Sequence, residues 1–500
     1  MRFKALLALL AGGLLPLAFA PLDWAWLAVL SPAVLFTLVA AVPRRQALWS
    51  AYLFGLGYFG VGVSWVFVSI SRYGNGPVVA AVVTAAFVAL LAFFPWLAVY
   101  LVRTLRPRMD GVALWLGLPA AWVLSEWVRL WFLTGFPWLF LGYSQTDTVL
   151  SGIAPVFGVL GVSLMLAMLA GGLAWTVQGP SMRRVAVTAS VLVVVLLGAQ
   201  LLERNWTHPM PEPLSVVLLQ GNIEQDKKWD PAYRAMTLER YRSLTEQHLG
   251  ADLIVWPEAA VPVWYAQASE YLAELEQKAD AAGSALVLGV PVQDGAGNAY
   301  NAVMSLSDPS GFYSKRRLVP FGEYIPLRDF IGPALDILGA PMSDFEAGEE
   351  ARLLSAAGLQ VGAFICYEAA YGAAIAEFLP EAQLLINVSN DAWFGESLGP
   401  LQHLQIARMR AIETQRPLLR ATNTGITAVI GADGRVLERA PQFEAAALTA
   451  EITPRKGATP YVRWRDWPVL ILAAFILALL PFGRGRARPG GEPEACIYSG

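Results

Sequence analysis

Residues 361–368 read Val-Gly-Ala-Phe-Ile-Cys-Tyr-Glu, an apolar run that ends in a thiol and a carboxylate. A short apolar run of this kind is typical of a buried strand. Comparable runs predict strands at 214–220, 251–256, 285–291, 302–306, 359–366, 384–388, 418–422 and 426–430. The stretches between them predict helices at 232–249, 266–282, 370–378 and 401–414. This alternation predicts an α/β domain whose helices cover the faces of its sheet.

Charged side chains are concentrated in the same part of the chain. Residues 203–464 carry 53 of them, whereas residues 1–202 carry 15 and residues 465–500 carry 7. The 500-residue chain is 56% hydrophobic and only 15% charged, compared with about 25% charged in soluble domains. We therefore expect a membrane domain at 1–202, a soluble domain at 203–464, a return to the membrane at 465–483 and a cytoplasmic tail at 484–500. A net charge of −3 argues against a nucleic-acid partner.

Eight apolar runs are candidates for transmembrane helices, because about 20 apolar residues cross a hydrocarbon layer of about 30 Å. They lie at 5–20, 24–42, 47–70, 77–102, 112–133, 150–177, 183–202 and 466–482. Basic residues, which are retained on the cytoplasmic side, follow the second, fourth, sixth and eighth runs; Arg44, Arg103 and Arg183 are examples. The pattern predicts that both termini are cytoplasmic and that residues 203–464 lie outside the cytoplasm.

The first apolar run has a second interpretation. Residues 1–20 combine a basic start, an apolar stretch and the small-residue ending Ala18-Phe19-Ala20, which is also the pattern of a cleavable signal peptide. Pro21, directly after the candidate site, fits cleavage poorly. Both interpretations leave residues 203–464 outside the cytoplasm.

Glu126 and Arg129 are the clearest ionisable residues inside a predicted span. Their spacing of three places them on one helical face, where they form either a structural ion pair or a contact for a lipid headgroup or an ion. An ion-coupled transporter would carry several buried acids or histidines, and the three histidines all lie outside the spans. The sequence therefore argues against a transporter.

Three reactive side chains follow apolar strands of the predicted α/β domain, where a sheet edge commonly presents functional groups. Glu258 ends the run 253–258, Lys315 lies within 313–326, and Cys366 ends the run 361–366. Taken singly, each has a structural interpretation: a small buried thiol, a helix-capping acid or a solvated basic run. Together they favour catalysis, because thiol, carboxylate and ammonium complement one another chemically.

These three groups can form a nucleophilic device. A thiol with a pKa of about 8.5 is only a few per cent thiolate near neutral pH. A carboxylate can take its proton as the sulfur attacks a carbonyl carbon and can later return the proton to the leaving group. A fixed ammonium would stabilise the oxyanion that forms. The expected product of the first step is a thioester on Cys366.

The ordered set Glu258, Lys315 and Cys366 resembles the Glu-Lys-Cys triad of the nitrilase superfamily, and the match is closest to the apolipoprotein N-acyltransferase family. The motifs that carry the resemblance are Gln220-Gly221-Asn222, Trp256-Pro257-Glu258, residues 318–324, Cys366-Tyr367-Glu368 and residues 387–395. The resemblance implies an α-β-β-α sandwich inserted between the seventh and eighth of eight transmembrane helices. Arg317 departs from the family pattern, which often has histidine at that position.

The resemblance also implies a reaction. Cys366 would take an acyl chain from a phospholipid, by family usage the sn-1 chain of phosphatidylethanolamine. It would pass the chain to the α-amino group of the diacylglyceryl-cysteine at an apolipoprotein N-terminus. Glu258 would be the general base and acid, and Lys315 the oxyanion donor. Glu323 would support the triad, and Tyr367 and Glu368 would shape the pocket.

The same resemblance implies a partner and a location for the chain. It implies no cofactor and no metal. The partners it implies are the two lipid substrates, the phospholipid and the apolipoprotein, which both lie in the bilayer. The location it implies is the bacterial inner membrane, with the catalytic domain on the periplasmic side. We expect a monomer, because nothing in the sequence demands more.

Two surface features have alternative interpretations. Trp229 matches a family position on an arm near the membrane, and with Lys227 and Lys228 it is either an interfacial anchor, with the lysines toward lipid phosphate, or an ordinary surface residue. Residues 330–345 form either a lid over the acyl chain or a segment packed on the sandwich; Leu335, Ile337, Leu338 and Met342 would contact the chain in the first case.

The alternative functions are a membrane-tethered amide or nitrile hydrolase that uses the same triad and a non-catalytic receptor that keeps the fold. The triad does not separate transfer from hydrolysis, whereas its completeness argues against the receptor. Seven predicted spans before the soluble domain exceed what a tether needs.

Overall fold

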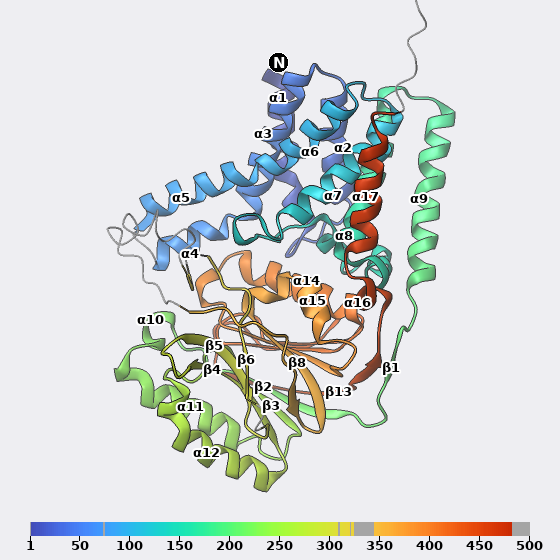
Figure 1. The fold of residues 1–500 in the computed structure, drawn as a ribbon. Helices are drawn as coiled ribbons and strands as arrows, with labels where there is room; N and C mark the ends of the chain where they lie inside the picture. The colour runs from blue at the N-terminus through green and yellow to red at the C-terminus, as the bar shows by residue number, and fades with distance from the viewer. Residues whose placement is uncertain (1, 74–75, 309–310, 321, 325–344, 483–500) are drawn as a thin grey trace, which may run out of the picture.

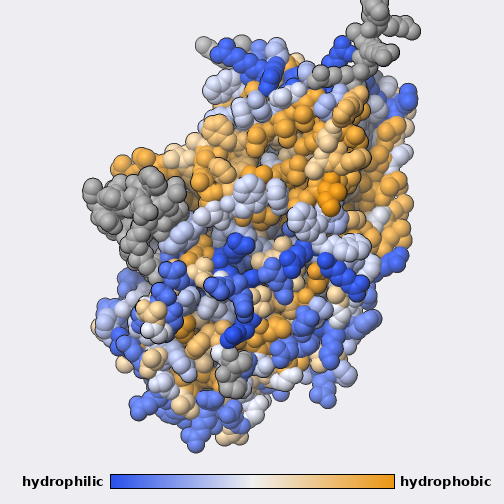
Figure 2. Space-filling view, viewed as in Figure 1, coloured by the Kyte–Doolittle hydropathy of each residue, from blue (hydrophilic) through white to orange (hydrophobic). Residues whose placement is uncertain are grey.

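The computed structural model describes residues 2–73, 76–308, 311–320, 322–324 and 345–482. A helical bundle stands on a β-sandwich, and the chain enters the sandwich after α9 and leaves it before α17 (Figure 1). The N-terminus and the last turn of α17 both lie at the end of the bundle away from the sandwich. On the face shown in Figure 2, apolar residues cover the bundle, with polar residues above them and over the sandwich below. This arrangement is typical of a domain that crosses a membrane.

The bundle helices overlap each of the eight predicted apolar runs, although several helices are shorter than their run. Their bounds are α1 Arg2–Leu14, α2 Leu27–Ala40, α3 Arg44–Gly62, α4 Trp65–Tyr73, α5 Gly76–Leu91, α6 Phe93–Leu105, α7 Leu118–Val128, α8 Ala154–Gln178, α9 Met182–Leu202 and α17 Trp467–Leu479. In the described part of the chain, three helical segments are long and apolar enough to cross a membrane: Gly76–Leu105, Val149–Gln178 and Met182–Leu202. The α3–α4 pair, bent by 54°, would make a fourth, and four shorter apolar helices accompany them.

Small residues let the bundle helices approach closely. A Cβ added at Gly12 of α1 would lie 2.0 Å from the Phe54 carbonyl oxygen of α3, and one at Gly171 of α8 would lie 2.0 Å from the Leu114 carbonyl oxygen. Such contacts hold helices together in lipid, where apolar surface alone gives no driving force. α1 is therefore an integral part of the bundle.

Glu126 and Arg129, for which an ion pair and a contact for a headgroup or an ion were both open, are buried and have separate hydrogen-bond partners. Glu126 Oε1 accepts hydrogen bonds from Trp122 Nε1 at 3.0 Å and from the Leu141 N–H at 2.9 Å. Arg129 Nη1 donates to the Trp138 carbonyl at 2.9 Å. The two side chains thus tie α7 to the segment that follows it.

The domain between α9 and α17 is built from two six-stranded sheets. The first has the order β13-β2-β3-β4-β5-β6 and the second the order β12-β11-β10-β9-β8-β7. The strands of the first sheet are β2 Leu214–Gln220, β3 Leu253–Val255, β4 Ala285–Gln293, β5 Ala299–Ser305, β6 Phe312–Ser314 and β13 Ala446–Ile452. Those of the second are β7 Leu354–Ala356, β8 Leu359–Ile365, β9 Leu384–Ser389, β10 Leu418–Thr422, β11 Ala428–Ile430 and β12 Val436–Arg439. β1 Thr207–Pro209 and β14 Arg455–Gly457 pair separately.

Helices cover the outer face of each sheet and complete an α-β-β-α sandwich, so the predicted fold class of this domain is confirmed. α11 and α12 cover the first sheet, and α14 and α15 lie between the second sheet and the bundle (Figure 1). The sandwich helices are α10 Gln225–Lys228, α11 Arg234–Glu246, α12 Tyr265–Ala282, α14 Gly372–Ile375, α15 Gly399–Thr414 and α16 Pro460–Trp464. In β2, Val216 and Leu218 face the second sheet and Val217 and Leu219 face α11 and α12, as the period of two requires.

The strands β2 and β10 coincide with the predicted ranges, whereas β6, β7, β12 and β13 were not predicted. β6 and β7 have three residues each, too few to show a periodicity. β12 and β13 are edge strands; the residues of β12 are mostly exposed and those of β13 mostly half-buried, so neither has the apolar signal of a buried strand.

Buried hydrogen bonds join the sandwich to the bundle. Gln402 of α15 accepts from Trp138 Nε1 at 2.7 Å and donates to the Gly62 carbonyl at 3.1 Å. Tyr73 donates to the Ala392 carbonyl at 3.1 Å. Nearly every residue of α15 is buried, because the bundle covers the face that would otherwise meet water. The bundle and the sandwich therefore share a continuous apolar core.

We predict that Gln402→Leu lowers the thermal stability of the protein. Gln402 is 3% exposed, and leucine would leave two buried polar groups unpaired, at a cost of about 1–3 kcal/mol each. The measurement is the apparent melting temperature of the purified protein in detergent. The control is Gln247→Leu, at an exposed side chain that bonds only to Ser243. Equal melting temperatures for the two variants would contradict the proposed role of this junction.

Candidate active site

The structure brings Glu258, Lys315 and Cys366 together from both sheets. Glu258 follows β3, Lys315 follows β6, and Cys366 follows β8. Lys315 Nζ lies 3.3 Å from Glu258 Oε1 and 2.7 Å from Glu323 Oε1. Lys315 and Glu258 are buried, while Cys366 is partly exposed. The site is thus an ammonium held between two carboxylates, with a thiol beside it.

Cys366 occupies a tight turn between β8 and a short 3₁₀ helix, Cys366–Ala370. Its φ of 49° lies in the left-handed region, which is unfavourable for a residue with a side chain. Such strain persists only where the surroundings fix the backbone, and it is common at active sites. The turn directs the thiol out of the strand, as nucleophilic attack requires.

Three buried residues, Arg420, Asp391 and His403, form a chain of hydrogen bonds that ends on the carbonyl oxygen of Cys366. His403 Nε2 lies 3.0 Å from the Cys366 carbonyl oxygen, and His403 Nδ1 lies 3.0 Å from Asp391 Oδ1. Arg420 Nη2 donates to Asp391 Oδ2 at 2.6 Å. The polar atoms of Cys366, Asp391 and His403 lie within 4.8 Å of one another, but the Arg420 guanidinium already neutralises Asp391, and a metal ion would have to displace it. The arrangement fits a support for the nucleophile better than a metal centre.

Asn301 and Asn390 fix the two carboxylates. Asn301 Nδ2 donates to Glu258 Oε1 at 2.7 Å and to Glu323 Oε1 at 3.2 Å. The Asn390 N–H donates to Glu258 Oε2 at 2.9 Å. Sequence reasoning missed both roles; Asn390 lies within the quoted motif 387–395, whereas Asn301 lies in β5 and carries no signal in the sequence.

Burial and charge set the protonation states of the triad. Burial acts to lower the pKa of Lys315, but the charges of Glu258 and Glu323 outweigh it and hold that pKa above its ordinary value. Burial acts to raise the pKa of Glu258, and the ammoniums of Lys315 and Lys228 outweigh it and lower that pKa. Burial raises the pKa of the Cys366 thiol, and the negative charge of Glu258 raises it further. The resting site therefore holds a thiol beside an ionised carboxylate, the arrangement that general-base catalysis needs.

Glu368 connects the loop of Lys315 to the turn of Cys366. Its carboxylate accepts hydrogen bonds from the N–H groups of Ile365 at 2.7 Å, Arg316 at 2.7 Å and Arg317 at 3.1 Å. It also accepts from the Tyr313 hydroxyl at 2.8 Å. Glu368 therefore fixes the relative position of the ammonium and the thiol without touching either.

Tyr367 and Arg317 face the bundle side of the site. Tyr367 donates to the Gly135 carbonyl at 2.9 Å, and its ring stacks on Trp138 with centroids 6.4 Å apart. Arg317 lies over the ring of Tyr371 at 5.4 Å. The 132–138 segment of the bundle thus contacts the sandwich directly beside Cys366.

Trp229 is 47% exposed, as an interfacial anchor requires. Its neighbour Lys228 does not point toward a headgroup: the side chain is buried, and Nζ donates to the Glu258 carbonyl at 2.9 Å. The expectation that both lysines face lipid phosphate is therefore wrong for Lys228. The reason is tertiary: α10 folds back over the end of β3, which the local sequence does not reveal.

The chain resembles proteins of known family over almost its full length. Residues 11–172 match the apolipoprotein N-acyltransferase N-terminal domain, and residues 215–461 match the carbon-nitrogen hydrolase family. The apolipoprotein N-acyltransferase of Methylococcus capsulatus is 50% identical over 97% of each chain. The chain belongs to the apolipoprotein N-acyltransferase family. The resemblance that the motifs indicated is thereby confirmed.

Other relatives agree with this family assignment. The apolipoprotein N-acyltransferase of Pseudomonas aeruginosa is 43% identical over 96% of each chain. Among solved structures, a CN-hydrolase superfamily protein from Xanthomonas campestris is 18% identical over 52% of this chain and 97% of that chain, with a TM-score of 0.36. A nitrilase-superfamily member from Saccharomyces cerevisiae is 17% identical over 49% of this chain and 91% of that chain with a TM-score of 0.37.

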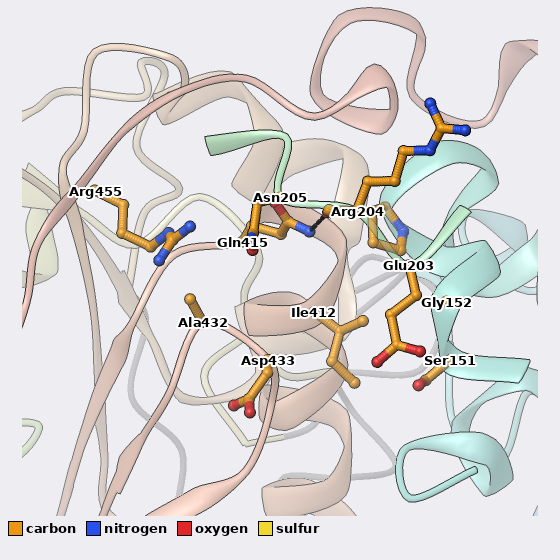
Figure 3. Close-up of a pocket in the computed structure, with 11 residues that line it drawn as sticks. Ser151, Gly152, Glu203, Arg204, Asn205, Ile412, Gln415, Ala432, Asp433 and Arg455 are labelled. Atoms are coloured by element: carbon orange, nitrogen blue, oxygen red, sulfur yellow. Dashed lines mark hydrogen bonds between the residues drawn. The ribbon is translucent and has the colours of Figure 1, made fainter. Parts of the chain in front are cut away.

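A cavity of about 490 Å³ in this family member lies between the end of α9, the start of α8 and the β11–β12 turn. Figure 3 shows its charged lining, which includes Glu203, Asp433 and Arg455. None of Glu258, Lys315 and Cys366 lines it. The chemistry of the triad therefore belongs to the junction with the 132–138 segment and not to this cavity.

The expected lid at 330–345 falls almost wholly outside the described residues, and the expected tail at 484–500 falls wholly outside them.

We predict that Cys366 reacts slowly with iodoacetamide at neutral pH. In a Cys496→Ser background Cys366 is the only thiol of the chain. Because the pKa of Cys366 is raised, its thiolate fraction keeps rising well above the ordinary midpoint of about pH 8.5. Mass spectrometry of the intact protein measures the alkylation rate against pH, with a model peptide thiol as the control. A plateau at or below the peptide's midpoint would contradict the electrostatics described for the site.

Proposed function

We propose that the protein transfers an acyl chain from a membrane phospholipid, through a thioester on Cys366, to the α-amino group of the diacylglyceryl-cysteine at an apolipoprotein N-terminus. The donor chain is the sn-1 chain of phosphatidylethanolamine. The observation that carries the proposal is the Glu258–Lys315–Glu323 cluster beside Cys366, in a chain of this family.

In the first step, Cys366 Sγ attacks the ester carbonyl carbon of the phospholipid while Glu258 takes the thiol proton. The carbonyl oxygen becomes an oxyanion that the Lys315 ammonium stabilises; removal of such a donor typically lowers the rate by 100- to 1000-fold. The tetrahedral intermediate then collapses, and Glu258 gives its proton to the departing glycerol oxygen. The products are the thioester and a lysophospholipid.

In the second step, the uncharged α-amino group of the apolipoprotein attacks the thioester carbon. Glu258 takes a proton from the attacking nitrogen and returns it to the departing sulfur of Cys366. Lys315 stabilises the second oxyanion as it did the first. The products are the N-acylated lipoprotein and the free thiol, so the cycle closes without a cofactor.

The position of the site favours transfer over hydrolysis. A thioester reaches an amine acceptor only if water is kept away, and the bundle covers the site through Tyr367 and the aromatic contact of Trp65 with Phe394, whose centroids lie 4.8 Å apart. A hydrolase that uses the same triad would need an open path for water to this carbon.

We assign supporting roles to the remaining residues. Glu323 orients Lys315 and shares its charge, Glu368 fixes the two loops, and Tyr367 shapes the side of the pocket that faces the bundle. Trp229 places its exposed indole at headgroup depth beside the entrance.

The proposed location is the bacterial inner membrane, with the sandwich in the periplasm and both termini in the cytoplasm. The eight apolar helical segments would act as eight spans, seven within residues 1–202 and one at 465–483, around a catalytic domain at 203–464 and ahead of a cytoplasmic tail at 484–500. Support comes from the basic residues that follow alternate spans and from Figure 1, where the start of α1 and the end of α17 lie at the same end of the bundle. We further propose that the unit is a monomer in the bilayer and that α1, packed on α3, is retained.

We predict that the purified protein, mixed with phosphatidylethanolamine and a diacylglyceryl lipopeptide, forms lysophospholipid and N-acylated lipopeptide in equal amounts. Cys366→Ser should abolish both products, because serine lacks the acidity and nucleophilicity of the thiol. The matched control is Cys496→Ser, which removes the other thiol and should leave both products unchanged. Mass spectrometry of the lipids and the peptide measures the two yields.

Two results of this experiment would refute the proposal. Release of free fatty acid without N-acylated peptide would identify the protein as a hydrolase. Formation of N-acylated peptide by the Cys366→Ser protein would exclude a thioester on this residue.

A further inference from the structure

Lys228 is a buried lysine at the active site that the triad chemistry does not use. It ends α10, its side chain is 5% exposed, and Nζ donates to the Glu258 carbonyl oxygen at 2.9 Å. Its neighbour Lys227 behaves differently, because its side chain is 34% exposed and pairs with Glu224 at 2.7 Å. Two adjacent lysines therefore have opposite environments.

A second contact links α10 to the same carboxylate. Gln225 Oε1 accepts a hydrogen bond from Asn390 Nδ2 at 2.6 Å, and the Asn390 N–H donates to Glu258 Oε2 at 2.9 Å. α10 is thus connected to the main chain of Glu258 through Lys228 and to its carboxylate through Asn390. Trp229, whose side chain is exposed, follows α10 directly.

The charges around Lys228 explain why an ammonium is buried there. One neutral carbonyl is a weak partner for a desolvated charge, which needs opposite charges nearby. The ionisable groups that face it in the described part of the chain are Glu258, Cys366 and Lys315. With Glu323, the cluster holds two carboxylates and two ammoniums, so its charges balance only when Lys228 is counted.

We propose that Lys228 is a positioning residue for acyl transfer: its buried ammonium balances the second carboxylate of the cluster and keeps Glu258 ionised as the base. Its hydrogen bond to the Glu258 carbonyl also fixes the α10 segment that carries Trp229. The inference rests on the proposed function, because Glu258 acts there as the proton acceptor in both steps.

The sign of the pH dependence follows from the charges. Removal of a cation beside Glu258 raises the pKa of that carboxyl, so Glu258 becomes protonated at a higher pH and is lost as a base. Burial lowers the pKa of Lys228 to about 8, against the opposing effect of Glu258 and Cys366. Below about pH 8, Lys228 of the wild-type protein is charged and helps to keep the Glu258 carboxyl ionised. Above about pH 8, Lys228 loses its proton and this effect on Glu258 is lost.

The test compares kcat/KM for N-acylation by Lys228→Met, Lys228→Gln and the control Lys278→Met from about pH 5 to 9.5. Lys278 is an exposed lysine of α12 that pairs with Glu246 and Glu274, outside the active site. We expect the acidic limb of both Lys228 variants to move up by about one pH unit or more, since a nearby opposite charge shifts a pKa by about 1–3 units. A shift of one unit corresponds to about a tenfold loss on the acidic limb, with a smaller loss above pH 8. Lys278→Met should follow the wild type.

Lys228→Gln keeps an N–H donor but removes the charge, so it separates the effect of the hydrogen bond from that of the ammonium. It also serves as the test if Lys228→Met fails to fold. Lys228→Arg keeps the charge and should keep the acidic limb in place. An equal loss at every pH, or no loss, in Lys228→Gln would overturn the inference and leave the proposed function standing. Failure of the wild-type protein to N-acylate the lipopeptide would instead refute the proposed function.

Discussion

The ammonium of Lys315, buried between the carboxylates of Glu258 and Glu323, is the interaction on which the rest of the site depends. Buried charges are stable only when good geometry and further hydrogen bonds satisfy them. Asn301 bridges both carboxylates, the Asn390 N–H binds the far oxygen of Glu258, and the Val319 N–H donates to Glu323 at 2.8 Å. Since these groups come from both sheets, the sandwich must be fully assembled before the charges can balance. The chemistry and the fold are therefore linked.

The bundle contributes one wall of the active site. It covers α15, whose His403 supports the Cys366 turn, and its 132–138 segment accepts the hydrogen bond of Tyr367. In a soluble hydrolase the same surface would meet water. Here the covering lowers the polarity around the thiol, which explains why the pKa of Cys366 is raised and why a base must act during attack. The membrane domain is thus a functional part of the catalytic unit and more than an anchor.

The sequence was most informative where a strand was buried and its end was reactive. β2 and β10 were predicted to the residue, and Glu258, Lys315 and Cys366 were selected because each follows an apolar run. Asn301, His403 and Arg420 were missed because their roles depend on partners that are distant in the sequence. Lys228 was misinterpreted for the same reason: its neighbour Lys227 is half-buried and its neighbour Trp229 is exposed, and only the fold of α10 over β3 shows that Lys228 is buried. Edge strands such as β13 were not predicted, because their residues are only partly buried and form no apolar run.

We propose that the acyl chain passes through Cys366 on its way from the phospholipid to the amine. The most direct measurement is a single-turnover experiment with phosphatidylethanolamine that carries an isotopically labelled sn-1 chain, followed by mass spectrometry of the peptide that contains Cys366. With the phospholipid donor alone, we expect the label to appear on the peptide that contains Cys366. After addition of the lipopeptide, the label should leave the peptide at the rate at which labelled N-acylated product forms. If labelled N-acylated product formed while the Cys366 peptide never carried the label, a thioester on Cys366 would be excluded.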